Sequence, residues 1–348
     1  MKKFNLMDLV RPNVAAMKPY SSARDEFADF DQEMIFLDAN ENPYDNGVNR
    51  YPDPQQGDLK SLIVHQKGLD TSQILLGNGS DEVLDLIFRA FCNPGKDNII
   101  SLPPTYGMYK VLAATNDIEN KEVLLNANFQ PDVAKILNQL DENTKIIFFC
   151  SPNNPTGNLI QPHLIEEILN NFSGLVVIDE AYIDFAASPS WISRLSEFPN
   201  LVVTQTLSKA YGMAGIRLGM CFASKDIIQI LNKIKPPYNV NKLSQIKAYE
   251  RVEDIAGVAS EITSIVNSRE LLLKALLEVD FVQEVYPSSA NFLLAKVDNA
   301  TVRYNQLITK GIVVRNRSSQ PLCENTLRFT VGTVQENETL INVLQTLA

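Results

Sequence analysis

The chain has 348 residues, of which 45% are hydrophobic and 21% charged, and its formal net charge is −10. A chain of this length and composition can bury the cores of about two globular domains. The acidic balance argues against a nucleic acid as the main partner, and the sequence has no run of the roughly 18 apolar residues that a membrane span requires.

The cysteines and histidines restrict the chemistry further. The four cysteines stand far apart and form no CxxC pair, and no apolar run of a signal peptide follows the first residues. We therefore expect a cytoplasmic protein with reduced thiols. Only two histidines occur, His65 and His163, so we expect neither a metal site nor a histidine-based triad.

Short apolar runs alternate with amphipathic stretches in the first two thirds of the chain. Residues 98–102, 145–150, 175–179 and 201–204 lack period-two alternation and are rich in β-branched and aromatic residues. These features are typical of strands buried on both faces of a parallel sheet. Helices are predicted at residues 81–91, 164–170 and 225–234. The alternation predicts an α/β fold with a mostly parallel central sheet flanked by helices.

The pattern changes after Pro236-Pro237. A long helical stretch is predicted at 242–278, bent near Gly257, and a final helix closes the chain. Strands are predicted between them at 291–296, 311–315 and 327–331. We interpret residues 237–348 as a smaller α+β domain, 45–236 as the large domain, and 1–44 as an N-terminal arm that packs with the small domain.

Four loops carry residues suited to chemistry. Gly77 to Glu82 has two glycines followed by a predicted helix, which suits either a phosphate cradle or a plain turn with a helix cap. Ser151 to Gly157 places paired asparagines between prolines, where an amide could bind a ligand oxygen. The other two are Asp179 to Tyr182, at the end of one predicted strand, and Thr206 to Ala210, after another.

Together the loops match what pyridoxal phosphate requires. The aldehyde needs a lysine with a lowered pKa, and Lys209 follows a buried strand with Arg217 eight residues further on. The pyridine nitrogen needs an anionic partner, for which Asp179 is the candidate. The phosphate needs an arginine, hydroxyls and backbone N–H groups.

Motifs along nearly the whole chain resemble the fold-type-I, class II family of pyridoxal-phosphate-dependent aminotransferases, and within it the histidinol-phosphate aminotransferases. The motifs that carry the resemblance are residues 37–44, 50–53, 77–82, 103–109, 151–157, 179–182, 206–209, 215–219, 290–292 and 327–333.

The resemblance implies a role for each site residue. Lys209 would form the Schiff base with pyridoxal 5'-phosphate and move the substrate's proton, and Asp179 would pair with the ring nitrogen. Tyr182 and Asn154 would bond the ring hydroxyl, and Tyr106 would stack on the ring. The phosphate region would consist of Ser80, Asp81, Thr206, Ser208 and Arg217. The substrate would bind to Arg328, assisted by Arg315, Tyr20 and Asn154.

The resemblance also implies a reaction and an assembly. The amino group would pass between L-histidinol phosphate and 2-oxoglutarate, giving imidazole acetol phosphate and L-glutamate, in histidine biosynthesis. Tyr51 would reach the site of a neighbouring subunit, so a homodimer is expected. Gln205 and Phe329 depart from the family's usual residues and bear on substrate preference.

Three other functions stay open on the sequence alone. An aromatic amino-acid aminotransferase is one, because a phenyl ring and an imidazole can share one pocket and differ by only about 1–3 kcal/mol in binding. A threonine-phosphate decarboxylase that depends on pyridoxal phosphate is another. A sensor that binds the cofactor without turnover is the third, although the chain has no basic DNA-binding module.

Overall fold

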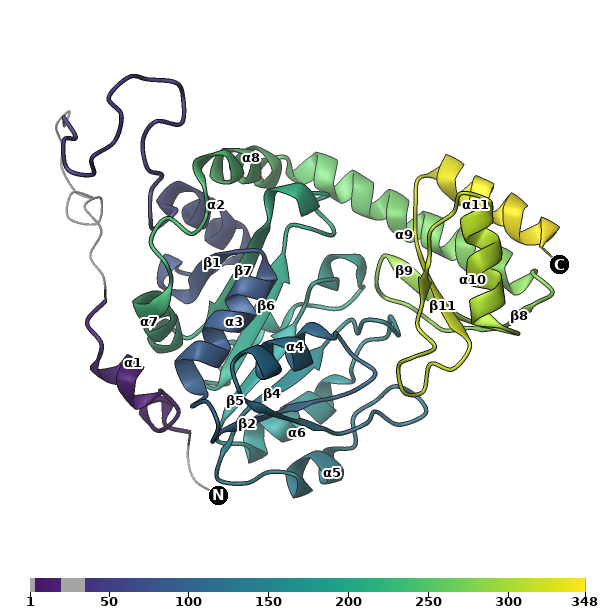
Figure 1. Ribbon diagram of the computed structural model, residues 1–348, viewed down its shortest axis with the longest axis horizontal. Helices are drawn as coiled ribbons and strands as arrows, with labels where there is room; N and C mark the ends of the chain where they lie inside the picture. Colours follow the sequence, from purple (N-terminus) through teal and green to yellow (C-terminus); the bar gives the residue numbers. More distant parts are fainter. Residues whose placement is uncertain (1–3, 20–34, 348) are drawn as a thin grey trace.

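The computed structural model describes residues 4–19 and 35–347, and two sheets organise them (Figure 1). The larger sheet has seven strands in the order β1-β7-β6-β5-β4-β2-β3. Their bounds are β1 Ile74–Asn78, β2 Asn98–Ser101, β3 Glu119–Glu122, β4 Thr144–Cys150, β5 Leu175–Asp179, β6 Leu201–Thr206 and β7 Leu218–Ala223. Strand β7 is antiparallel to both of its neighbours, β1 and β6, and the pairs from β6 to β3 are all parallel.

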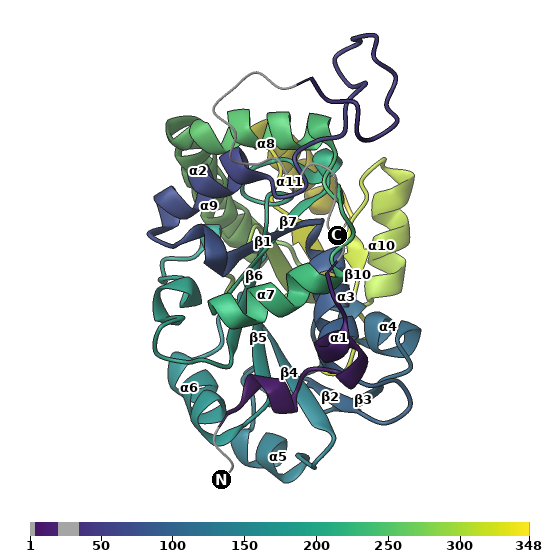
Figure 2. The ribbon, with the colours of Figure 1, turned by 90° about the vertical axis from the view of Figure 1, so that its left-hand side faces the viewer.

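Helices cover both faces of this sheet, as a parallel sheet with apolar strands requires (Figure 2). One face packs against α2 Gly57–Lys67, α5 Val133–Asn138, α6 Pro162–Asn171 and α8 Lys242–Glu253. The other packs against α1 Pro12–Ala16, α3 Ser80–Phe91, α4 Met108–Thr115 and α7 Lys225–Ile234. Neighbouring residues of one strand pack in the cores on opposite faces of the sheet: Phe148 packs on the α3 side and Phe149 on the α6 side.

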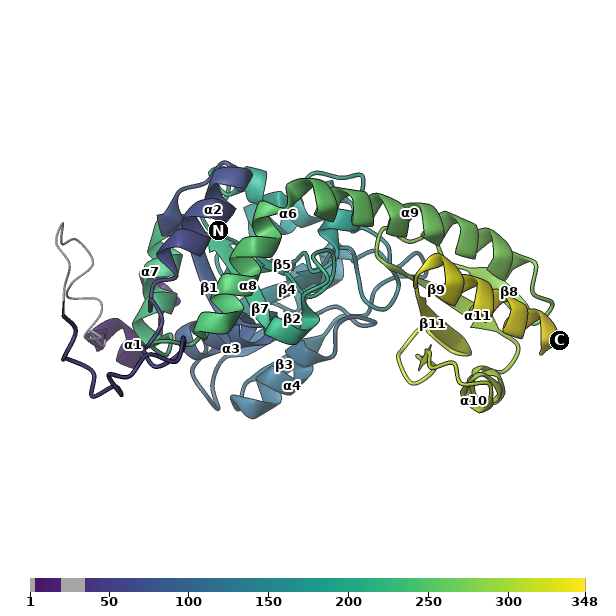
Figure 3. The same cartoon turned by 90° about the horizontal axis from the view of Figure 1, so that it is seen from above.

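The smaller sheet forms a second lobe, in the order β10-β11-β9-β8 with every pair antiparallel. Its strands are β8 Val282–Val285, β9 Phe292–Val297, β10 Arg315–Asn316 and β11 Thr326–Thr330, and its helices are α9 Ile255–Leu277, α10 Ala300–Thr309 and α11 Val334–Thr346. The long α9 runs from the large lobe to the small one (Figure 3). No helix in the described ranges is both long and apolar enough to cross a membrane.

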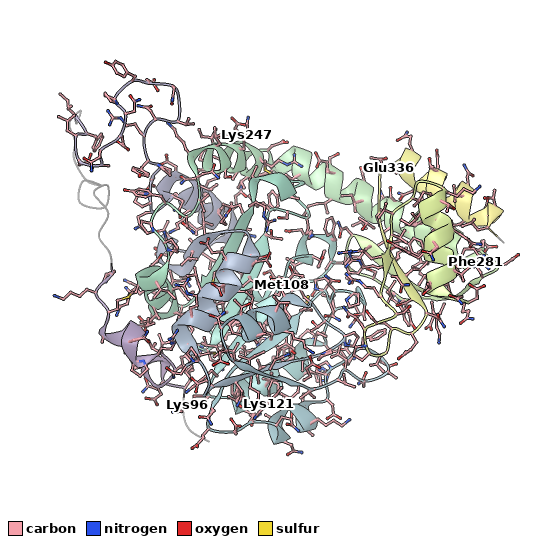
Figure 4. All side chains as sticks on the ribbon, viewed as in Figure 1. Lys96, Met108, Lys121, Lys247, Phe281 and Glu336 are labelled. Carbon is pink, nitrogen blue, oxygen red and sulfur yellow. The ribbon has the colours of Figure 1, made fainter. Side chains whose placement is uncertain are left out.

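Short 3-10 turns complete the fold. They are η1 Leu6–Asp8, η3 Thr71–Gln73, η4 Ile183–Phe185, η5 Trp191–Arg194 and η6 Ala214–Ile216. Side chains fill the space around the ribbons, with Met108 of α4 near the middle of the view and Phe281 in the small lobe (Figure 4).

Two predicted elements differ from the observed ones. The stretch 242–278 is two helices that meet at Asp254, three residues before the expected bend, because the Asp254 carboxylate accepts a hydrogen bond from the Gly257 N–H and caps α9. Of the strand predicted at 311–315, only Arg315 is in a strand.

Two segments pack against a different lobe from the one that the sequence predicted. The domain boundaries themselves stay a prediction. Leu9, Val10 and Val14 pack in the core beside α3 and α7 of the large lobe, where the sequence predicted contact with the small domain. Helix α8, assigned by sequence to the small domain, packs on α2 through Ala248 and Val252. In both cases a few apolar side chains pack on the core of the large lobe. The sequence pattern shows that these residues are apolar, but it does not determine which core they join.

A close approach holds β1, β7 and α3 together. Gly77 of β1 pairs with Gly219 of β7, and the chain between β1 and α3 passes directly over Gly219. A Cβ at Gly219 would lie 2.2 Å from the Ser80 backbone nitrogen. The position therefore requires glycine for space.

Replacing Gly219 with alanine should lower the free energy of unfolding by about 1–3 kcal/mol, because the methyl group must displace backbone. Urea unfolding of the purified protein measures this. Gly215→Ala is the matched control, since a Cβ there meets nothing within 4 Å, and its effect should be about 1 kcal/mol or less. Equal losses in both variants would show that the approach of Ser80 to Gly219 is not a constraint.

Candidate active site

The strand order brings the chemical loops to one edge of the large sheet. Strands β1, β4, β5 and β6 end there, and β7 begins there because it runs the other way. A cavity of about 230 Å³ lies at this edge. It is lined by Ser80, Asp81, Tyr106, Cys150, Asn154, Asp179, Ala181, Tyr182, Thr206, Ser208, Lys209, Arg217, Arg315, Arg317 and Arg328.

A buried carboxyl lies at the floor of the cavity. Asp179, the last residue of β5, is only 3% exposed. One of its oxygens accepts a hydrogen bond from the Tyr109 hydroxyl at 2.9 Å, and the other accepts one from the Ala181 N–H at 3.1 Å. Burial raises the pKa of Asp179 to about 6, and these hydrogen bonds oppose that rise. The site thus suits a cationic ligand atom that would pair with the carboxylate.

Two tyrosines lie around this carboxyl, Tyr106 in the loop before α4 and Tyr109 in α4 itself. Tyr109 is fully buried and stacks on Phe148, with ring centroids 4.8 Å apart. Tyr106 packs edge-on against Tyr109 at 5.6 Å and donates a hydrogen bond to Asp81 at 3.0 Å. Tyr106 is thereby held as an aromatic wall of the cavity.

Lys209 lies just beyond β6, with its ammonium nitrogen 5.7 Å from the centre of the Tyr182 ring. Burial lowers the pKa of Lys209, and the nearby Arg328 and Arg217 lower it further, against the opposing effect of Asp179. A lysine in such surroundings holds more neutral amine near neutral pH than a surface lysine, which is what a nucleophile or a general base needs.

The start of α3 and the start of β7 form an anion cradle. Helix α3 begins at Ser80, and because Ser80 and Asp81 line the cavity, the N-terminal end of the helix with its unpaired N–H groups lies at the cavity. Arg217 adopts a left-handed backbone with φ +55° and lies 3.5 Å from the Asp81 carboxylate. A Cβ on Gly79, whose φ is +85°, would lie 2.8 Å from the Arg217 guanidinium, so the loop and the arginine fit closely.

Hydroxyls complete the cradle on the β6 side. The hydroxyl oxygens of Thr206 and Ser208 lie 3.0 Å apart, and the Ser208 N–H donates to the Thr206 oxygen at 3.1 Å. A helix N-terminus, an arginine and hydroxyls are the groups that bind a phosphate. The residues present therefore fit the phosphate of a cofactor.

Three arginines enter the cavity from the small lobe. Arg328 of β11 donates a hydrogen bond to the Asn154 amide oxygen at 2.6 Å and lies 5.0 Å from the centre of the Phe292 ring. Arg315 of β10 is the direct strand partner of Arg328, and Arg317 follows two residues later. Burial, together with the neighbouring Arg317, lowers the pKa of Arg328 to about 10.

The cavity brings together nearly every site residue proposed from the sequence. Tyr51 is the exception among the described residues, because it lies outside this cavity and stacks on Tyr238 with ring centroids 4.5 Å apart. Tyr20 lies outside the described residues. Two groups that the sequence did not single out also shape the site: Arg317 lines the cavity beside Arg315, and Tyr109 lies behind Asp179 without lining it. Alternation with Arg315 along a strand is the signal that could have found Arg317.

The fold and this cavity define the class. The chain belongs to the class I and II aminotransferases, whose family model matches residues 31–344. Within that class it is 64% identical over 348 residues to a histidinol-phosphate aminotransferase of Flavobacterium johnsoniae, with 100% of both chains covered.

Solved structures share the fold at lower identity. The histidinol-phosphate aminotransferase of Clostridium acetobutylicum superimposes with a TM-score of 0.80 at 24% identity, covering 86% of this chain and 91% of that one. That of Sinorhizobium meliloti, in complex with pyridoxal-5'-phosphate, gives a TM-score of 0.78 at 23% identity, covering 86% and 84%. The predicted fold class and the predicted enzyme class are thereby confirmed.

Replacing Tyr109 with phenylalanine tests the support of Asp179. The carboxyl is ionised at about pH 8 and neutral at about pH 4.5, because its folded pKa lies near 6. Loss of a hydrogen bond to the ionised group should lower the free energy of unfolding of the cofactor-free protein by about 2 kcal/mol at the higher pH, against about 1 kcal/mol at the lower.

Denaturant unfolding at the two pH values measures the difference. Tyr304→Phe, on α10 of the small lobe, is the control and should show no pH-dependent loss. A loss in Tyr109→Phe that does not grow between the two pH values would contradict the idea that the hydroxyl stabilises the carboxylate.

Proposed function

We propose that this chain is a pyridoxal-phosphate-dependent histidinol-phosphate aminotransferase, which transfers an amino group between L-histidinol phosphate and 2-oxoglutarate. One observation carries the proposal. A single cavity joins a lysine of lowered pKa, a buried carboxyl and a group of arginines, in a chain 64% identical over its whole length to a relative named for this activity. The products would be imidazole acetol phosphate and L-glutamate.

The residues that line the cavity suit the ring and the phosphate of pyridoxal 5'-phosphate. When bound, this cofactor accepts the negative charge that develops at the substrate's α-carbon. Asp179 would hold the ring nitrogen in its protonated form, and Tyr182 and Asn154 would bond the ring hydroxyl. Tyr106 would cover the ring. The residues of the phosphate region would be Ser80, Asp81, Thr206, Ser208 and Arg217.

Lys209 would act both as the attachment point and as the base. Its lowered pKa lets the neutral amine form without strongly alkaline pH, and the same amine can then remove the proton from the substrate's α-carbon and return it. Arg217 and Arg328 help to keep that amine neutral by their charge.

The substrate's remote anion would bind at the small-lobe arginines. Arg328, oriented by Asn154, would take the phosphate of histidinol phosphate in one half-reaction and a carboxylate of glutamate in the other. Arg315 lies on the paired strand and would assist. Tyr20, the third residue that the resemblance implies here, stays a prediction.

A homodimer is part of the proposal. Tyr51 is half exposed and lines two surface hollows, one that contains the exposed Ile246 and one that contains the exposed Leu243. Residues 35–50 extend from the body of the chain and carry Ile35, Leu37 and Tyr44, each more than 80% exposed (Figure 1). Such apolar exposure in a single chain favours a partner subunit, to whose cofactor phosphate Tyr51 would reach.

Location in the cytoplasm also stays a prediction. The four cysteines are all buried and unpaired, which is compatible with a reducing compartment.

Replacing Lys209 with alanine should abolish transamination and the visible absorbance of the lysine-bound cofactor. Turnover should fall by at least about a thousandfold, since both attachment and proton transfer are lost. Absorbance spectra of the purified variant, with added pyridoxal phosphate, measure the first effect. Lys310→Ala, at the exposed end of α10, is the control and should retain both. A Lys209→Ala variant that still transaminates would falsify the assignment.

Titration of the holoenzyme with two amino donors tests the substrate. L-histidinol phosphate at low concentration should convert the absorbance of the lysine-bound cofactor to that of the aminated cofactor, whereas L-phenylalanine should need a large excess. A better response to phenylalanine would make the protein an aromatic amino-acid aminotransferase. No cofactor band after addition of pyridoxal phosphate would refute the proposed function altogether.

A further inference from the structure

Arg317 belongs to the same row of side chains as Arg315. Successive residues of a strand point to opposite faces, so residues two apart share a face. The Arg317 N–H donates to the Thr326 carbonyl at 2.9 Å and continues the pairing of β10 with β11, and the Arg317 carbonyl accepts from the Gln320 N–H at 2.9 Å. The backbone of Arg317 is therefore fixed, and its side chain lines the cavity together with those of Arg315 and Arg328.

The three guanidinium groups have no carboxylate partner among the described residues. The two carboxyls that line the cavity are engaged elsewhere, Asp81 with Arg217 and Tyr106, and Asp179 with Tyr109. The buried Nε atoms of Arg317 and Arg328 have no hydrogen-bond partner within the described part of the chain. Burial and the neighbouring Arg315 lower the pKa of Arg317.

This arrangement is unfavourable without a ligand. Like charges directly opposite each other on paired strands repel, and the part-buried guanidinium groups of Arg317 and Arg328 have lost part of their hydration. A multiply charged anion between the three guanidinium groups, which share one face of the β10–β11 pairing and its continuation at Arg317, would offset this cost.

We propose that Arg317 is a substrate-binding residue that gives this subsite its preference for a phosphate dianion over a carboxylate. The inference rests on the proposed function, which places the phosphate of one substrate and the carboxylate of the other at the same arginines. Two arginines can hold a carboxylate in bidentate fashion with charge to spare. A phosphate ester has three free oxygens and close to two negative charges at pH 7, so it can use the third guanidinium as well.

The experiment replaces Arg317 with glutamine and compares how much the holoenzyme loses toward phosphate ligands and toward carboxylate ligands. KM for histidinol phosphate should rise roughly ten- to a hundredfold, the usual range for a lost charge-assisted hydrogen bond. The factor by which KM for glutamate rises should be at least about five times smaller. Calorimetric titration with inorganic phosphate and with acetate gives a readout without turnover, in which phosphate should lose affinity by about tenfold and acetate by much less.

Three variants control the interpretation. Arg317→Lys keeps the charge and should retain most of the phosphate preference. Arg317→Met keeps the aliphatic stem and repeats the measurement if the glutamine variant loses its fold. Arg303→Gln removes an arginine of the same lobe that pairs with Asp298 instead, and should leave the ratio of the two KM values unchanged.

The outcomes separate this inference from the proposed function. Equal losses for phosphate and carboxylate ligands, or an Arg317→Lys variant as impaired as Arg317→Gln, would overturn the role of Arg317. A wild-type holoenzyme that does not use histidinol phosphate would overturn the proposed function, while the titration with inorganic phosphate would still decide whether Arg317 selects dianions.

Discussion

The carboxyl of Asp179 is buried at the end of β5, and the surrounding structure is arranged to tolerate its charge. An ionised carboxylate out of water is costly unless donors and an opposite charge surround it. The protein supplies two donors, the Tyr109 hydroxyl and the Ala181 N–H. Tyr109 is in turn fixed by its stack on Phe148, which itself stacks on Phe88 of α3, so the apolar core between sheet and helix sets the position of the acid. The missing opposite charge is what a protonated ring nitrogen would provide.

The reversal of β7 explains why the anion cradle lies beside that acid. Because β7 runs antiparallel to β1 and β6, its first residues lie level with their last ones, Leu218 opposite Asn78 and Gly219 opposite Thr206. Arg217, which precedes β7, thereby meets the start of α3 after β1 and the hydroxyls that end β6. In an all-parallel sheet the same arginine would enter at the opposite edge, where no helix N-terminus or hydroxyl of this set lies.

The parts of the fold that depend on local pattern were predictable from the sequence, and those that depend on pairing were not. The apolar runs of β2, β4, β5 and β6 predict buried strands, and the amphipathic spacing of α3 predicts a helix. Strand β1 contains Gly77 and ends at a turn, and nothing in the sequence of β7 shows that it runs backwards.

The same division holds for the site. Motifs identified Lys209, Asp179 and Arg217, and their convergence follows from strand order. Tyr109 was hidden because a tyrosine in an amphipathic helix has the pattern of a core residue. Arg317 was hidden because the strand predicted at 311–315 stopped two residues short of it, so its alternation with Arg315 did not show.

The two lobes divide the work of binding between them. The groups suited to the cofactor come from the large lobe, from the loops that follow β1, β2, β4, β5 and β6 and from the start of β7, whereas Arg315, Arg317 and Arg328 come from β10, the residues just after it, and β11 of the small lobe. The hydrogen bond from Arg328 to Asn154 joins the two sets directly. An acidic chain can therefore hold a strongly positive cavity, because its cations are gathered where the lobes meet and their mutual repulsion is relieved by an anionic ligand. Because the two sets come from different lobes, substrate preference can change through β10 and β11 without disturbing the residues that would hold the cofactor.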